Sequence, residues 1–148
     1  MSRRDSREAA VKIIFQNEFI DGRLRSGGDA ETELSVEDMI AMFIESVDEK
    51  EMAKVDRTFV AKVLGAVLDN IETIDELICD NIDSGWNINR LCKVDLAILR
   101  EAIAEIRYID DIPVSVSINE AVELSKKFSY PEASSFVNGI LGSVSKND

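Results

Sequence analysis

The chain has 148 residues, 45% of them hydrophobic, and a formal net charge of −12 at pH 7. This length and composition suit a single domain over residues 1–148 with its own core. No apolar run reaches the roughly 18 residues that cross a bilayer, and no signal-type apolar stretch follows the N-terminus, so we expect a cytoplasmic protein. The sequence has no histidine, which excludes histidine bases, histidine-dependent nucleophiles and histidine-rich metal sites, and it has no P-loop pattern. We therefore expect a protein that is not an enzyme and uses neither a metal nor a cofactor.

Apolar residues recur at three- and four-residue spacing along most of the chain, which predicts helices. The first helix is expected from about Arg4 to Ile20, and the glycine-containing stretch 22–33 is expected to be a loop. Ser35 and Asp38 form a capping-box pattern, so a second helix should begin there and end near residues 48–50.

The middle of the chain predicts two further long elements. Residues 55–82 have the longest helical periodicity, with a kink expected at Asp69-Asn70. Residues 91–106 are apolar on more than one face, which is typical of a central helix that is buried on several sides. Residues 110–113, with their proline, should end it.

The C-terminal part predicts two last helices. Ser117 and Glu120 form a second capping-box pattern, and Pro131 suits the first turn of the final helix. Residues 114–118 alternate like a strand but have no partner run, so we do not expect a strand there. The predicted fold class is all-α, with six or seven helices.

Cys79 and Cys92 are the only cysteines, and they lie 13 positions apart. Because no histidine completes a metal site, each is expected to be a small core or boundary thiol.

The negative charge is concentrated in one region. Residues 29–83 carry four basic and sixteen acidic groups, whereas residues 1–28 carry six basic and four acidic groups. The net charge argues against general nucleic-acid binding, but this distribution allows an anion at the N-terminus and a cationic partner elsewhere. The alternative is that the acidic residues only solvate helix faces.

Arg3, Arg4 and Arg7 share one face if the N-terminus is helical, since successive residues turn by about 100°. The positive end of the helix dipole and the exposed backbone N–H groups favour phosphate there, and guanidinium groups bind phosphate through two parallel hydrogen bonds. Phe15 falls on the same side and could stack an unpaired base. These residues indicate single-stranded RNA binding, with a solvated helix end and a core phenylalanine as the alternatives.

Three parts of the chain share their order and spacing with one known family. They are the start Arg3–Val11, the middle with Trp86–Leu91, Val94–Arg100 and Glu105, and the end with Ile112–Val114, Ile118–Leu124 and Phe136–Leu141. Together they resemble the NusB family over nearly the whole chain. The resemblance implies two packed three-helix bundles that bind the boxA element of nascent ribosomal RNA transcripts. It also implies pairing with NusE, a ribosomal protein, and action on RNA polymerase, although some members form homodimers.

Carried over position by position, the resemblance implies RNA contacts at seven residues: Arg3, Arg4, Arg7, Phe15, Asp95, Lys126 and Phe136. The position of Phe15 is often tyrosine in the family, and phenylalanine keeps the stacking face without the hydroxyl. Lys126 and Lys127 lie in a segment where the family often has one lysine. Arg100 is expected either to pair with a buried acid such as Asp95 or to contact RNA. Arg4 and Arg7 are both expected to be exposed.

The acidic region suggests a surface for a basic ribosomal protein. Glu72, Asp75 and Glu76 are the candidate partner-binding residues. Two other interpretations remain at this point. One is an RNA-binding accessory domain like that of some ribosomal RNA methyltransferases, and the other is a helical protein-interaction module without RNA binding.

Overall fold

The structure is a computed structural model that describes residues 3–18, 35–82 and 91–146. Over these ranges the chain forms eight helices and no strand, which confirms the all-α prediction. The helices are α1 (Arg3–Glu18), α3 (Val36–Ser46), α4 (Glu49–Met52), α5 (Arg57–Asp69), α6 (Ile71–Asp80), α7 (Lys93–Tyr108), α8 (Val114–Phe128) and α9 (Ala133–Lys146). The expected loop at 22–33 and Trp86 lie outside the described residues.

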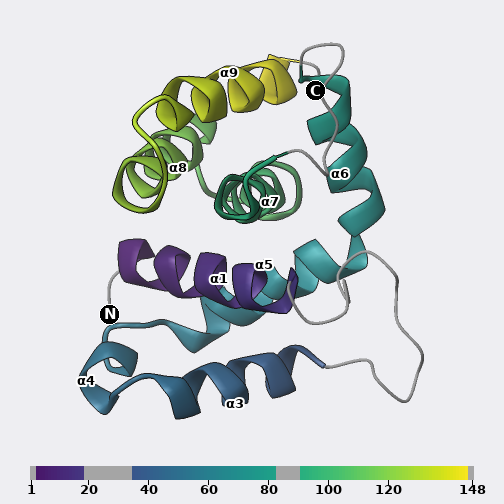
Figure 1. The fold of residues 1–148 in the computed structure, drawn as a ribbon. Coiled ribbons are helices and arrows are strands. Elements are labelled where there is room, and N and C mark those ends of the chain that lie inside the picture. The colour runs from purple at the N-terminus through teal and green to yellow at the C-terminus, as the bar shows by residue number, and fades with distance from the viewer. Residues whose placement is uncertain (1–2, 19–34, 83–90, 147–148) are drawn as a thin grey trace.

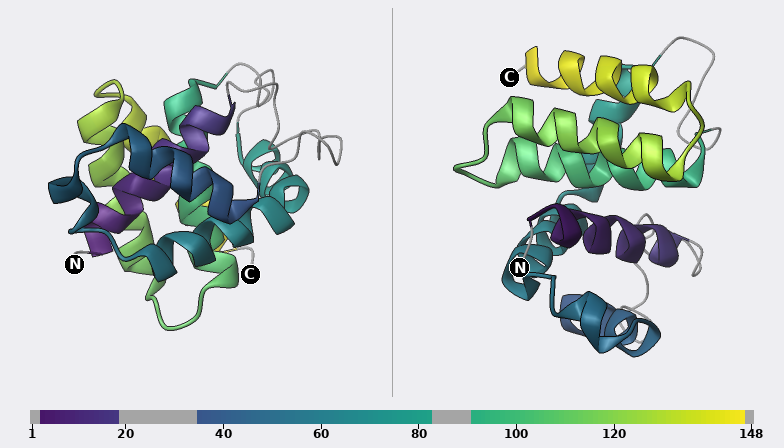
Figure 2. Two further views of the ribbon diagram at one scale, coloured as in Figure 1. Left: turned by 90° about the horizontal axis from the view of Figure 1, so that it is seen from below. Right: turned by 90° about the vertical axis from the view of Figure 1, so that its left-hand side faces the viewer.

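Helix α7 is the centre of the molecule, as predicted for residues 91–106. Helices α1 and α5 pack against it from one side, α8 and α9 from another, and α6 flanks it (Figure 1). Figure 2 shows α7, α8 and α9 as one bundle stacked on a second bundle of α1, α3 and α5. Every residue from Asp95 to Glu105 is buried, since neighbouring helices cover α7 on several sides.

Local sequence signals set several helix ends. Ser35 accepts a hydrogen bond from the Asp38 backbone N–H, and the Asp38 carboxylate accepts one from the Ser35 N–H, so the predicted capping box is confirmed. The kink predicted at Asp69-Asn70 is a break between α5 and α6 at Asn70. The segment expected only to end the second helix also contains the short helix α4, which Asp48 caps. The break at Asn70 and the additional helix α4 bring the number of helices in the described ranges to eight, compared with the six or seven expected.

The capping box predicted at Ser117 and Glu120 is wrong. Helix α8 already begins at Val114, directly after Pro113, so Ser117 lies inside it and is buried. Proline presets its own φ near the helical value, and this start requires no side-chain cap. Pro131 lies in a turn two residues before α9 begins rather than in its first turn.

Both cysteines are free thiols, as expected, but they are exposed and not in the core or at its boundary. Cys79 directly follows the buried Ile78 on α6. Cys92 directly precedes α7. Within the described ranges no helix is long and apolar enough to cross a membrane.

Asp56 joins the start of α5 to α1. Its carboxylate accepts hydrogen bonds from the N–H groups of Thr58 and Phe59, and its own backbone N–H donates to Ser6 of α1 at 2.8 Å. We expect Asp56→Ala to lower the free energy of unfolding by about 1 kcal/mol, because two helix N–H groups lose their acceptor. Urea unfolding measures this.

Asp69→Ala is the matched control. Asp69 is an exposed carboxylate at the opposite end of α5, where a negative charge opposes the helix dipole. Its removal should leave stability unchanged or slightly raised. Equal destabilisation by both substitutions would contradict a capping role for Asp56.

Candidate nucleic-acid interface

Arg3 is the first residue of α1 and stacks on an aromatic ring. Its guanidinium carbon lies 4.2 Å from the ring centroid of Phe59, a buried residue of α5. Cation–π attraction at this distance orders the otherwise flexible side chain. Arg3 is exposed, so the surface of the guanidinium away from the ring faces solvent.

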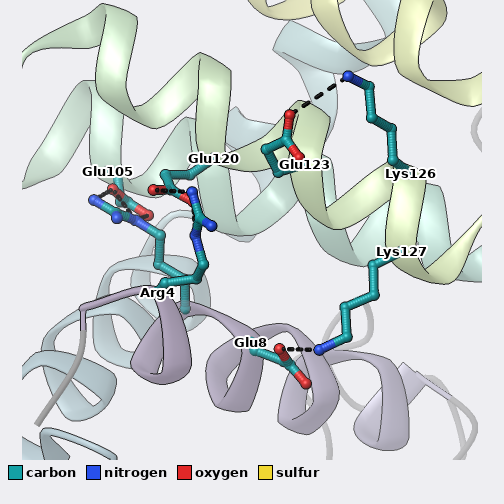
Figure 3. Close-up of polar contacts among 8 residues, drawn as sticks. Arg4, Glu8, Glu105, Glu120, Glu123, Lys126 and Lys127 are labelled. Atoms are coloured by element: carbon teal, nitrogen blue, oxygen red, sulfur yellow. Dashed lines mark hydrogen bonds and ion pairs between the residues drawn. The ribbon is translucent and has the colours of Figure 1, made fainter.

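Arg4 points toward α8 and forms an ion pair at the surface (Figure 3). Its Nε lies 2.9 Å from Oε2 of Glu120, and its Nη2 lies 3.2 Å from Oε1. The side chain of Arg4 is 63% exposed, whereas that of Glu120 is 18% exposed. The hydrogen bond and charge of Glu120 raise the pKa of Arg4. The guanidinium is therefore at the surface, and a carboxylate occupies its two-donor edge.

Arg7 is buried, so the expectation that it is exposed is wrong. Its side chain is 3% exposed, and it donates three hydrogen bonds of 2.8 to 3.0 Å to the carboxylate of Glu105 on α7. Burial alone would lower the pKa of Arg7, but the hydrogen bonds and charge of Glu105 outweigh it and raise the pKa. Arg7 lies on the same side of α1 as Ala10 and Ile14, which are also buried. The spacing of Arg7, Ala10 and Ile14, three and then four residues apart, is the signal in the sequence that indicates the burial of Arg7.

A second buried acid adjoins this pair. Glu101 lies one turn before Glu105 on α7 and is 1% exposed. Burial, together with the hydrogen bond and charge of Glu105, raises the pKa of Glu101 well above its usual range. Burial would also raise the pKa of Glu105, but hydrogen bonds from Glu101, Arg7 and Ser117 lower it. Of the two acids, Glu101 is thus the one whose pKa is raised, and Glu105 is the carboxylate that binds Arg7.

Lys127 connects the end of α8 to α1. Its Nζ lies 2.9 Å from Oε2 of Glu8, and Lys12 reaches the other oxygen of the same carboxylate at 3.3 Å. Lys126, the lysine carried over from the resemblance, instead pairs with Glu123 of its own helix at 3.4 Å (Figure 3). Of the two lysines, Lys127 is therefore the one beside the α1 arginines.

A hollow of about 240 Å³ lies between α1 and α8. Its lining is Arg4, Glu8, Glu120, Glu123, Leu124 and Lys127. A positive group therefore lines it from each helix, together with three carboxylates. The ion-paired residues along the contact of α1 with α8 form the α1–α8 seam, which consists of Arg4, Glu8, Lys12, Glu120 and Lys127.

Phe128 is an aromatic residue that the sequence interpretation missed. Its side chain is partly exposed at the end of α8, and the ammonium groups of Lys127 and Lys12 lie 5.2 and 5.8 Å from its ring centroid. A partly exposed ring among lysines is suited to stacking with a base. The adjacent lysines at 126 and 127 were the available signal.

The other aromatic and acidic site candidates are less accessible than the resemblance implies. Phe15 and Phe136 are half-buried and pack against the core. Asp95 is buried in the first turn of α7, burial raises its pKa, and its Oδ1 has no hydrogen-bond partner among the described residues. The structure brings neither Phe136 nor Asp95 into the α1–α8 seam.

The acidic candidates on α6 divide into two kinds. Glu72 and Glu76 are exposed. Asp75 instead accepts two hydrogen bonds of 2.9 Å from Arg100, which is fully buried in α7. Arg100 therefore pairs with Asp75 and not with Asp95, and the Asp75 carboxylate, whose side chain is 17% exposed, is engaged by this ion pair. No cluster of three possible metal ligands occurs in the ranges that the structure describes.

Comparison with known proteins decides between the interpretations. The model of the NusB family matches residues 4–146. The transcription antitermination protein NusB of Ruminiclostridium cellulolyticum is 40% identical over 148 residues, which are 100% of this chain and 91% of the relative. That of Natranaerobius thermophilus is 44% identical over 144 residues, covering 97% of this chain and 94% of the relative. The chain belongs to the NusB family.

Solved structures agree with this assignment. NusB of T. maritima superimposes with a TM-score of 0.75 at 31% identity, covering 99% of this chain and 92% of that one. A structure of the antitermination factors NusB and NusE in complex with dsRNA gives a TM-score of 0.73, with 99% and 97% coverage. Its identity is 20%, so it shows the shared fold. The NusB family consists of transcription antitermination factors and not of enzymes, which confirms the predicted function class.

Truncation of Arg7 should lower the stability of the fold strongly, whereas truncation of Arg4 should hardly change it. Arg7→Ala leaves the Glu105 carboxylate buried without its cation, so we expect a loss of about 3–5 kcal/mol in the free energy of unfolding. Arg4→Ala removes an exposed side chain and should leave the midpoint of urea unfolding nearly unchanged. Similar midpoints for the two variants would show that the Arg7–Glu105 pair does not hold the fold.

Glu101 should make stability fall as the pH rises. Its pKa in the folded protein is above the unfolded value, so its contribution is complete below the unfolded pKa and is lost as the pH rises through the folded pKa. Glu101→Gln stays neutral, so it should lose less stability than the unmodified protein as the pH rises above the unfolded pKa of a glutamate. Unfolding curves at a series of increasing pH values test this, with Glu123→Gln, on the exposed face of α8, as the matched substitution.

Proposed function

We propose that this chain binds boxA-type single-stranded RNA of nascent ribosomal RNA transcripts, pairs with the ribosomal protein NusE and acts with it on RNA polymerase. The observation that carries the RNA part is the exposed pair of arginines in the first turn of α1, with Arg3 held on the ring of Phe59 and Arg4 beside α8. The solved relative, a complex of NusB and NusE with dsRNA, supports pairing with NusE and RNA binding in general.

The chemistry of this end of α1 suits unpaired RNA. Two guanidinium groups at the positive end of the α1 helix dipole offer donors to phosphate oxygens. Phe128, and beyond it the half-buried Phe15 and Phe136, offer aromatic faces to bases. Arg7 does not contact RNA in this proposal, because it is buried against Glu105.

The partner surface is proposed on the exposed acidic residues Glu72 and Glu76 of α6. Their negative charge complements a basic ribosomal protein. The whole chain, residues 1–148, is proposed to act as a single domain in the cytoplasm, where transcription takes place. Pairing of two copies of the chain is the alternative to pairing with NusE.

Loss of the two exposed arginines should weaken RNA binding. We expect Arg3→Ala/Arg4→Ala to lower affinity for a boxA-type RNA roughly tenfold or more, since each charged hydrogen-bonding contact is worth about 1.5–3 kcal/mol. The slope of log affinity against log salt should become less steep by roughly 1.4, which corresponds to two lost phosphate contacts. Fluorescence anisotropy with and without NusE measures both.

Lys62→Ala/Lys146→Ala is the matched control, because it also removes two exposed cations but lies on α5 and α9. A scrambled RNA is the control for sequence. The proposal would be falsified by RNA affinity that is equal in both double variants, or by equal affinity for boxA and scrambled RNA in the presence of NusE.

A further inference from the structure

We propose that Glu120 and Glu8 restrain RNA binding by occupying the cations of the α1–α8 seam, so that RNA binds there by replacing these carboxylates with its phosphates. The proposal rests on the proposed RNA-binding function and concerns how strongly the same surface binds. It assigns Glu120 and Glu8 a role in setting affinity and selectivity.

Glu120 holds Arg4 in the geometry that a phosphate would use. Nε and Nη2 of Arg4 donate side by side to the two carboxylate oxygens, at 2.9 and 3.2 Å. Guanidinium groups bind phosphate oxygens through the same two-donor edge. A phosphate and Glu120 therefore compete for one set of donors. The exchange is possible without unfolding, because the Arg4 side chain is 63% exposed.

Glu8 holds two further cations of the seam. One carboxylate oxygen accepts from Lys127 of α8 at 2.9 Å, and the other pairs with Lys12 of α1 at 3.3 Å. Burial would raise the pKa of Glu8, but the two lysines outweigh it and lower the pKa. Glu8 is thus ionised at neutral pH and neutralises part of the lysine charge.

The seam therefore has donors for RNA but little net positive charge. Arg4, Lys12 and Lys127 face Glu8 and Glu120, and Glu123 adds a third carboxylate to the hollow between the helices. A phosphate entering the hollow meets cations whose charge is already partly neutralised, and it gains the side-by-side donors of Arg4 only by displacing Glu120. Backbone contacts alone then give weak binding, and RNA whose bases make additional contacts is favoured.

The decisive experiment is a double-mutant cycle between Glu120 and Arg4. We expect Glu120→Gln to bind single-stranded RNA about two- to fivefold more tightly, since an exposed ion pair contributes about 0.4–1 kcal/mol. In an Arg4→Ala background the same substitution should give no gain, because the competed donor is absent. Affinities are measured by anisotropy on the full chain at one fixed salt concentration, with circular dichroism to verify folding.

Glu8→Gln is the second test and should also raise affinity, with the gain lost when Lys12 and Lys127 are replaced by Ala. Glu45→Gln is the matched control, because it removes one exposed carboxylate on α3, outside the proposed RNA and partner surfaces, and should change affinity least. It separates release of a specific cation from a general reduction in negative charge.

The outcomes separate this proposal from the proposed function. A gain for Glu120→Gln that needs Arg4 supports it, including when the unmodified chain alone binds RNA too weakly to detect. A gain that persists without Arg4, or equals that of Glu45→Gln, overturns it. No gain or a loss for Glu120→Gln, while Arg3→Ala/Arg4→Ala still lowers affinity, overturns only this inference. No RNA binding by any variant, either alone or with NusE, overturns both.

Discussion

The buried ion pair between Arg7 and Glu105 fixes where the rest of the candidate site lies. It joins α1 of one bundle to α7 of the other, and Ser117 of α8 donates to the same carboxylate at 3.0 Å. Burying two charges costs solvation free energy, which is offset here because the carboxylate receives several hydrogen bonds. The contact sets the rotation of α1 about its axis. With Arg7 turned inward, Arg4 is directed toward α8 and Arg3 toward Phe59. The arginine motif thus combines one residue that fixes the helix with two that remain at the surface.

Arg3 and Arg4 are proposed RNA contacts on a protein whose overall charge is strongly negative. The two properties are compatible because exposed charges interact mainly over short distances in salt solution. At physiological ionic strength exposed charges are screened over about 8 Å. The net charge of −12 therefore matters less to an RNA at α1 than Glu120 and Glu8, which touch the cations directly. In the proposed function, the distant acidic residues of α6 disfavour RNA on their own part of the surface. In the same proposal, the adjacent Glu120 and Glu8 set how readily the seam exchanges a carboxylate for a phosphate.

Features that depend on neighbouring residues in the chain were predictable from the sequence, and features that depend on a distant partner were not. The capping box at Ser35 was correct because both of its members are local. The identical pattern at Ser117 was wrong because Pro113 starts the helix earlier and Glu105 takes up the serine hydroxyl. For Arg7, the helical wheel gave its angle to Arg3 and Arg4 but not which direction pointed inward. The spacing from Arg7 to Ala10 and Ile14 contained that information, but an arginine is not expected to continue an apolar stripe.

The partner of Arg100 could not be predicted from the sequence either, because it lies on a different helix. This pairing also shows how α7 organises the fold. A helix covered on several sides can keep ionisable residues only where a neighbouring helix supplies a partner. Arg100 is paired with Asp75 of α6, and Glu105 with Arg7 of α1 and Ser117 of α8, so these two residues connect α7 to three helices from both bundles. Close apolar packing and directional hydrogen bonds between buried charges both oppose rotation of these helices. The position of α1 relative to α8, and with it the spacing of Arg4, Glu120, Glu8 and Lys127, therefore depends in part on charges inside the molecule. An RNA surface built on two helices from different bundles requires such a constraint, because its cations keep their spacing only if the bundles do not shift.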